Sequence, residues 1–562
     1  MTLFHAHITR RLALAAVLAV SARGSRAEQA FVGILEADSY QSVIYGASAF
    51  SRVADLPIAL EVINATLMKT LALPSFTGVS STDTMRVVQT VDPALPLTDS
   101  NPANVAIMPL SDTGATVLRS FSTAYATRSQ SGSITLFEQP NDTNLAARVA
   151  VAVTGRFLLT STSRAALVWA WENRTRLIDA PPQTIAGTLR VLVNPQRLAD
   201  VLGTRSEKAA SVVNLDRLIR DFETFSFSLT LEGQAITLTL HGKPAAGSAL
   251  QSLQAALRPP ASRLWNGLPE NAFFASLSAC DTSKAWDTYL GESHLRLLRP
   301  ITGLAPDGAF TGDRLLYLAP TKTKKGLCFV QVEPVKNADA VCQAIQKLHT
   351  IKADDGIELV RRPTRQVEKT QIESYEVNLH PSPVQASGGK PEDPSLTYTL
   401  ASLFLKQAVL EAAVADGHLI CVLGPADVLE DELPNLAFRE KALKLYRKIG
   451  VQSGETMEKN LCLGSSLNVA DLLRHIVTIM PGVKPEHLRV LSSGGDGATF
   501  GISKGDDQTL TASLSIQSNE IAALQRMNRD GREVLQELFF QIFSNQMMNL
   551  QAPPSETKKQ GP

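Results

Sequence analysis

Three short segments contain residues whose types and spacing would suit chemistry, and Asp416-Gly417-His418 is the first of them. A carboxylate beside an imidazole can orient the ring for general-base catalysis. However, Asp-Gly between two apolar runs is also the strongest short-range signal of a two-residue β-hairpin. The matching segment of the first half, Thr154-Gly155-Arg156, keeps the glycine and lacks both the acid and the histidine. We therefore predict a hairpin turn here rather than a catalytic pair.

The other two candidates are a glycine-rich run and two pairs of acids. Ser492-Ser493-Gly494-Gly495-Asp496-Gly497 could cradle a phosphate, but a P-loop requires G-x-x-x-x-G-K-[ST] leading into a helix. The lysine is missing here, and a strand pattern follows. Asp354-Asp355 and Asp506-Asp507 lack the D-x-[DN]-x-[DN]-G spacing of a calcium loop. We predict a linker and two solvated turns.

The histidines and cysteines form no metal-binding pattern. Residues 28–562 contain seven histidines without an HExxH or other close pair, namely His241, His294, His349, His380, His418, His475 and His487. The five cysteines, which include no CxxC, are Cys280, Cys328, Cys342, Cys421 and Cys462. The apolar runs around Cys328 and Cys421 are typical of buried thiols. An oxidising compartment would still permit one disulfide, and the odd number leaves at least one free thiol.

We therefore assign no catalytic, cofactor-binding or metal-ligating residue, and we predict no cofactor. Two alternatives remain open. A triad assembled from distant segments leaves no local signature in a sequence. Trp169 and Trp171 lie two residues apart in a helical pattern, so both cannot face the core, and one could stack on a ligand. We favour an edge or inter-module contact for this pair.

The N-terminal residues predict export. Arg10 and Arg11 precede a mostly apolar run, Leu12–Ala22, which is too short to span a bilayer. Ser25-Arg26-Ala27 fits a cleavage site, so we predict a signal peptide at residues 1–27. The arginine pair also allows twin-arginine export. No later apolar run is long enough for a membrane span, and we expect a periplasmic or extracellular protein.

Composition indicates a globular protein with a sizeable core. The 562 residues suffice for two to four domains, and 44% are hydrophobic against 19% charged, which argues against disorder. Removing residues 1–27 takes away four arginines, so 54 basic residues become 50 against 54 acidic ones. A weakly acidic chain gives no reason to expect a nucleic-acid partner.

An approximate internal repeat organises the chain. Glu270-Asn271-Ala272-Phe273 echoes Glu28-Gln29-Ala30-Phe31, and later strands, turns and helices recur in the same order. We predict an α+β fold of two tandem, divergent copies of a module of antiparallel sheet with packed helices. The modules would occupy residues 28–260 and 264–550, with a C-terminal helix in the second and a disordered tail at 551–562.

Apolar periodicity places the elements of each predicted module. In the first module we expect strands at Phe31–Ala37, Asn104–Leu110, Ser133–Phe137, Arg148–Val153, Phe157–Thr160, Thr188–Val193, Phe225–Leu231 and Ala235–His241, and helices at Pro57–Leu71, from a cap at Ser111 or Asp112 to Phe121, from Ser163, at Pro195–Leu202 and at Ala249–Leu257. In the second we expect strands at Phe273–Ala279, Phe329–Val332, Ala412–Ala415, Leu419–Leu423, Leu463–Asn468, Ala498–Ser503 and Thr509–Ile516, and helices at Asn337–Leu348, Val469–Ile476 and Asn519–Asn545. The strict alternation in Phe225–Leu231 predicts one buried face and one solvated face.

This arrangement of a Glu-x-Ala-Phe strand, a glycine-turned hairpin and a closing alternating hairpin resembles large uncharacterised exported bacterial proteins known as domains of unknown function. The resemblance spans most of residues 28–562. It implies export and a duplicated α+β scaffold. It implies no activity, and no functional residue is carried over from it.

Three functional hypotheses follow from the sequence. The first is a non-enzymatic binding protein of the bacterial envelope, whose partner is a protein or a small-molecule ligand. The second is a hydrolase with a site assembled in the cleft between the two modules. The third is a structural assembly component. We favour a binding or structural role, because what recurs between the halves is apolar residues and turns, which serve packing.

Overall fold

The computed structural model describes most of the chain between residues 30 and 532. The described residues are 30–56, 58–91, 103–125, 127–138, 148–179, 186–206, 215–231, 234–260, 264, 268–269, 271–280, 305–306, 308–321, 326–350, 357–379, 408–429, 460–479, 483, 496–505 and 507–532. The predicted signal peptide and the predicted tail lie outside them, as does the predicted C-terminal helix beyond residue 532. None of the described helices is long and apolar enough to cross a membrane.

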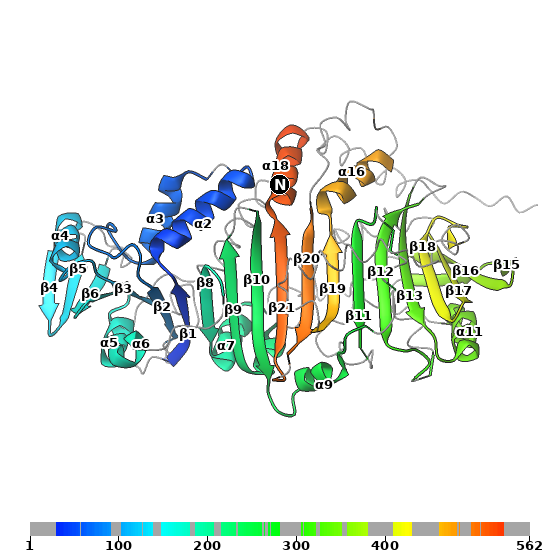
Figure 1. The fold of residues 1–562 in the computed structure, drawn as a ribbon, viewed down its shortest axis with the longest axis horizontal. Coiled ribbons are helices and arrows are strands. Elements are labelled where there is room, and N and C mark those ends of the chain that lie inside the picture. The colour runs from blue at the N-terminus through cyan, green and yellow to red at the C-terminus, as the bar shows by residue number, and fades with distance from the viewer. Residues whose placement is uncertain are drawn as a thin grey trace, which may run out of the picture.

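Within the described residues, the strands form one antiparallel sheet of 21 strands. Figure 1 shows this sheet running along the length of the molecule. Across one half of the sheet the neighbours are β4 (Thr127–Ser131), β5 (Ile134–Glu138), β6 (Arg148–Thr154), β7 (Phe157–Ser161), β3 (Ala103–Pro109), β2 (Met85–Val91), β1 (Ala30–Ala37), β8 (Leu189–Val193), β9 (Phe222–Leu231) and β10 (Ala235–Pro244). The other half continues through β21 (Leu510–Gln517), β20 (Ala498–Lys504), β19 (Leu461–Leu467), β11 (Phe274–Ala279), β12 (Asp313–Pro320), β13 (Leu327–Pro334), β18 (His418–Gly424), β17 (Val409–Ala415) and β16 (Thr370–Leu379), which pairs with β14 (Ile357–Arg361) and β15 (Arg365–Val367).

The prediction of two tandem modules, each with a sheet of its own, is wrong. Strands β10 and β21 pair directly, in register from Ala235↔Gln517 to Gly242↔Leu510. The two predicted closing hairpins therefore lie side by side in the middle of one sheet. The physical reason is that a hairpin at the end of a module leaves an open edge, and pairing two such edges satisfies the backbone groups of both. Helices and antiparallel strands do occur together, so only the coarse α+β description is retained.

Helices flank this sheet on both faces. They are α2 (Tyr40–Val53), α3 (Leu60–Thr70), α4 (Ala115–Ala124), α5 (Arg164–Glu172), α6 (Arg174–Ile178), α7 (Pro195–Ser206), α8 (Leu215–Arg220), α9 (Ala249–Ala256), α11 (Ala338–Gln346), α16 (Val469–Ile479) and α18 (Ser518–Asp530), with the short 3-10 helix η5 (Leu348–Thr350). Figure 1 shows α9 and α18 at opposite ends of the central strands, with α2 and α3 together beside α18. An ion pair between Arg529 and Asp55, at 3.2 Å, joins α18 to the end of α2.

Most predicted elements are confirmed within a few residues, including β1, α3, α16 and the β9–β10 hairpin. One predicted cap is wrong. Helix α4 begins after Gly114, whose left-handed φ of 87° makes the turn, while Asp112 accepts a hydrogen bond from the Gly114 N–H. No prediction covered α2, β2, β4, α8, β12 or β14–β16. Helix α2 has a clear start signal in retrospect, since Ser39 and Ser42 form a reciprocal capping box.

The buried apolar core lies in the outer parts of the sheet. Residues paired directly across antiparallel strands point to the same face, so the register divides the core into layers. In the half that contains β1, one layer packs Met108 and Phe137 with Phe121 of α4, and the opposite layer packs Leu159 with Leu167 of α5. The half of the sheet that contains β13 also has a layer of buried apolar side chains on each face. The strands at the centre contribute little to these clusters.

Tyr375 of β16 is buried, and its hydroxyl group makes a polar contact with α11. We expect the ionisation of this group to lower the stability of the protein at alkaline pH. The Tyr375 hydroxyl donates to the Ile345 carbonyl of α11 at 2.6 Å. Burial, assisted by the charge of Glu373, raises the Tyr375 pKa from 10.0 to about 12. Because the folded state holds the phenol proton more tightly, this contribution to stability is complete below pH 10.0 and is lost as the pH rises through about 12. Denaturant unfolding across this range should show the decline.

The matched control is Tyr375→Phe, which keeps the ring and removes the titrating group. We expect a lower free energy of unfolding at neutral pH, by about 1 kcal/mol for the lost hydrogen bond. We also expect a flatter pH dependence between pH 10.0 and about 12. An unchanged alkaline slope in this variant would contradict the assignment.

Candidate functional site

The predicted turn at Asp416-Gly417 is confirmed. Asp416 and Gly417 have φ values of 47° and 75°, and they connect β17 to β18 as a two-residue hairpin loop. Left-handed φ at both central residues is the requirement of a type I′ turn. His418 Nδ1 lies 2.8 Å from the carbonyl oxygen of Asp416, so the imidazole contacts its own turn.

The other segments named from the sequence are a turn and a linker where they are described. Asp507 lies in the loop between β20 and β21 and accepts hydrogen bonds from the Thr509 hydroxyl and N–H, which lower its pKa. Gly497 has a φ of 75° and immediately precedes β20. Residues 354–355, 492–495 and 506 lie outside the described residues. Trp169 and Trp171 are both partly buried against one core cluster, which agrees with an edge contact.

All five cysteines are free thiols, and no group of three or more His, Cys, Asp or Glu side chains among the described residues could hold a metal ion. Cys328, Cys421 and Cys462 are buried, while Cys342 is exposed on α11. Burial is the main cause of the raised pKa of Cys421 and of Cys462. These thiols behave as small hydrophobic side chains.

Thiol labelling should separate these cysteines. In the native protein we expect a fast phase from Cys342, a slower phase from the half-buried Cys280, and reaction of the three buried thiols only on unfolding. A chromogenic disulfide reagent measures the phases directly. Cys342→Ser should remove the fast phase and leave the others unchanged. A fast phase that persists in this variant would contradict the exposures described here.

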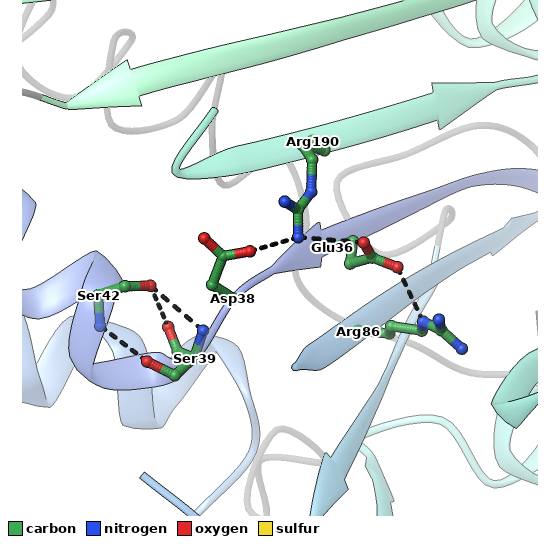
Figure 2. Close-up of polar contacts among 6 residues, drawn as sticks. All are labelled: Glu36, Asp38, Ser39, Ser42, Arg86 and Arg190. Atoms are coloured by element: carbon green, nitrogen blue, oxygen red, sulfur yellow. Dashed lines mark hydrogen bonds and ion pairs between the residues drawn. The ribbon is translucent and has the colours of Figure 1, made fainter. Parts of the chain in front are cut away.

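A buried ion-pair network surrounds Glu36 at the end of β1 (Figure 2). The Glu36 side chain is 2% exposed and accepts from Arg86 Nε at 3.1 Å and from Arg190 Nη2 at 3.1 Å. Arg190 Nη2 also contacts Asp38 at 2.6 Å. We call these four residues the Glu36 network. Its two acids and two arginines balance formally, so it joins β1, β2 and β8 without an unbalanced charge.

The Glu36 network fixes three elements together. Glu36 pairs in register with Arg86 on one side and with Arg190 on the other, so all three side chains point to the same face. Arg86 Nη1 donates to the carbonyls of Leu177 and Ile178 at 2.9 and 2.7 Å, which places a cation at the C-terminal end of α6. A cation there satisfies the last carbonyls and complements the helix dipole.

Similar buried acid–arginine pairs support the other half of the sheet. They are Asp313–Arg258, Glu333–Arg314, Glu373–Arg361 and Glu411–Arg365. Glu411 also accepts from the N–H groups of Asp427 and Leu429, both at 2.9 Å. Buried charges require such partners because desolvation of an unpaired ion is costly. We therefore assign these pairs to stability rather than to catalysis.

The junction of β10 and β21 carries a row of hydroxyl groups and one histidine. Thr237 Oγ1 donates to Ser515 Oγ at 3.1 Å, and His241 Nδ1 lies 3.0 Å from Thr511 Oγ1. Burial lowers the pKa of His241, which favours the neutral imidazole. Because the two strands are hydrogen-bonded neighbours, the described residues leave no cleft between the halves at this junction. The hydrolase hypothesis required such a cleft.

The opposite face of the central strands is apolar and partly exposed, with Leu229 and Ile502 at its margins packed against core clusters. We call it the central apolar face, and it consists of Phe227, Leu229, Leu231, Ile236, Leu238, Leu240, Leu467, Phe500, Ile502, Leu514 and Ile516, which the register places on one side. Each of these side chains is at least partly exposed, and Leu514 and Leu467 reach 36%. By contrast, the serines on the other face of these strands are covered, and Ser228, Ser513 and Ser515 are each 1% exposed.

This partial exposure departs from the usual arrangement of an antiparallel sheet, in which apolar side chains are buried and polar ones face water, although Phe225 and Leu510 at one end of the same face are buried. The alternation in Phe225–Leu231 predicted one buried and one solvated face. The structure instead leaves Phe227, Leu229 and Leu231 partly exposed and buries Ser228. Contiguous apolar surface of this kind marks an interaction site more often than an isolated exposed leucine does. Alternation in the sequence identifies the apolar face of the strands, but it does not show whether that face is exposed to solvent.

A small cavity lies beside the Glu36 network. Its volume is about 300 Å³, and the described residues that line it are Asp83, Thr84, Arg86, Ile107, Pro109, Arg156, Phe157 and Ile178. Ile107 pairs in register with Arg86, so the cavity opens on the Glu36 side of the sheet, opposite the central apolar face. Arg156 follows Gly155 in the turn between β6 and β7. The sequence predicts only a turn at this position.

No protein-family model, curated protein or solved structure matches this chain. The resemblance to exported proteins of unknown function therefore stays a prediction. Sequence reasoning missed the Glu36 network, although a charged residue within an apolar strand such as Phe31–Ala37 was a usable signal. It could not pair that acid with Arg86 and Arg190, because the pairing depends on the order of strands in the sheet.

Proposed function

We propose that this protein is an exported, non-enzymatic binding protein of the bacterial cell envelope, and that the central apolar face is the surface on which a partner protein packs. The observation that carries the proposal is the exposure of that face. Leu514 and Leu467 are each 36% exposed at the middle of the sheet, where neighbouring strands already shield every side chain from two sides.

The size of the face favours a protein partner. It spans five strands at ~4.8 Å spacing and about five residues at ~3.4 Å, which gives roughly 400 Å² of flat surface. Helix α2 extends the surface, because Gly46 packs against Leu231 and the adjacent Tyr45 is 66% exposed. Val53, Leu60 and Val62 on α2 and α3 are also exposed. The central apolar face alone supplies roughly half of the ~800 Å² per partner of a standard interface.

The gain from covering this face is large enough to matter. At about 25 cal/mol per Å², burying roughly 400 Å² of apolar surface contributes about 10 kcal/mol before the costs of association are subtracted. The central strands are hydrogen-bonded on both sides, so a partner cannot add a strand here and must pack on the side chains. Export rests on the predicted signal peptide at residues 1–27.

Photo-crosslinking in the native envelope tests this proposal. A photoreactive amino acid replaces Leu514 on the central apolar face, and in a matched protein it replaces Leu192, which is 45% exposed on the opposite face. We expect a discrete crosslinked protein from position 514 and none from position 192. The pair Leu238→Asp and Leu467→Asp should abolish that product. The same products from both positions would overturn the proposal.

The hydrolase hypothesis receives no support of its own from the geometry. Its strongest residue is His241, whose recorded side-chain contact is the hydroxyl of Thr511 within a closed strand pair. The exported binding protein is therefore our conclusion.

A further inference from the structure

The half-open cavity beside the Glu36 network combines an apolar wall with charged side chains, and it is separate from the central apolar face. About 300 Å³ is at the lower end of small-molecule pockets. Its apolar wall comes from four side chains on three elements, namely Ile107 and Pro109 of β3, Phe157 of β7 and Ile178 of α6. Pro109 and Phe157 are cross-strand partners, so this wall is part of the sheet and is rigidly held.

The polar groups of the cavity have different roles. Arg86 is 11% exposed, and Glu36 and the two carbonyls of α6 hold it in place, so it acts as a fixed part of the wall. Asp83 accepts a hydrogen bond from the Ser80 hydroxyl at 2.8 Å. Because Asp83 adds a negative charge to the rim, the cavity disfavours multiply charged anions such as phosphate.

Arg156 supplies the cation that a ligand would use. Its backbone is fixed, because the Leu110 N–H donates to the Arg156 carbonyl at 2.7 Å and the residue closes the β6–β7 hairpin. The side chain is exposed, and no ion pair to another described residue is recorded for it. An exposed guanidinium beside an apolar wall is suited to bidentate pairing with a carboxylate.

We propose that this cavity binds a small organic monocarboxylate with a compact apolar body. The carboxylate pairs with the guanidinium of Arg156. The apolar body packs on Ile107, Pro109, Phe157 and Ile178. The proposal does not depend on the central apolar face, which lies on the other side of the sheet.

Calorimetric titration of the chain from residue 28 with 3-phenylpropanoate tests the proposal. We expect saturable binding of the carboxylate, at least tenfold weaker binding of the uncharged 3-phenylpropanamide, and no binding of inorganic phosphate. Arg156→Gln should weaken carboxylate binding at least tenfold. The matched control is Arg164→Gln, which removes another arginine, hydrogen-bonded to Ser131 and outside the cavity, and should leave binding unchanged.

Each other outcome overturns the proposal. Absence of carboxylate binding would do so, as would equal binding of the acid and the amide, or binding that Arg156→Gln does not weaken. Because Arg156 is exposed, the variant is expected to fold, and its circular dichroism and midpoint of unfolding verify this. The Leu238→Asp and Leu467→Asp variants should bind the carboxylate normally, which separates this test from that of the proposed function.

Discussion

Glu36→Ala is expected to destabilise the protein by about 3–5 kcal/mol, the cost of leaving buried charges without their partner. Arg86 and Arg190 are 11% and 12% exposed, and they share Glu36. Asp38, which is 62% exposed, remains as a partner for Arg190. Arg86 keeps the α6 carbonyls but loses its carboxylate. Denaturant unfolding monitored by circular dichroism measures the difference.

The control for this prediction is an exposed pair on the same sheet. Glu138→Ala removes the partner of Arg148, where the two side chains are 35% and 55% exposed, and should cost less than about 1 kcal/mol. Equal effects of Glu36→Ala and Glu138→Ala would contradict the role that we assign to the network. Glu36→Gln should lie between them, since it keeps the shape and the acceptor oxygen while removing the charge.

Leu238→Pro is expected to cost on the order of 3 kcal/mol or more, because proline removes a backbone donor from a strand that is paired on both sides. Leu238 lies opposite Leu229 of β9 and Leu514 of β21. If the junction holds the two halves in one sheet, the loss of this N–H weakens the whole molecule. Limited proteolysis should then release fragments that end near the junction.

Leu238→Ala separates the backbone from the side chain. The side chain is only partly buried, so its truncation should cost less than about 1.5 kcal/mol, well below the Leu→Ala losses of a closed core. If the proline and alanine variants were equally stable, the β10–β21 ladder would not be a principal link between the halves. A large loss in the alanine variant would show that another part of the molecule covers the central apolar face.

Local elements were largely predictable from the sequence. Alternation placed β1 and the β9–β10 hairpin, helical spacing placed α3 and α16, and Asp416-Gly417 predicted a turn that has the left-handed φ values of its type. These predictions hold because the physics is local. A two-residue loop with left-handed φ at both residues and a helix with apolar residues every three or four positions depend mainly on near neighbours.

The candidate sites depended on contacts that are distant in the sequence. Glu36 contacts Arg86 and Arg190, and Arg156 shares a cavity with Asp83 and Ile178. A single sequence shows that charged residues occupy apolar strands, but the choice of partner requires the strand order. For the same reason the sequence predicts only a turn at Arg156 and no part in a cavity.

The sequence by itself therefore determined the kinds of elements, the turn at Asp416-Gly417 and the apolar row of the central strands. Only the tertiary structure decided that the two closing hairpins join into one sheet, since edge pairing depends on which strands meet in space and not on their local pattern. The tertiary structure also decided which side of these strands is covered. Periodicity identifies an apolar face, but the exposure of Leu514 and the burial of Ser513 depend on which segments pack over each side.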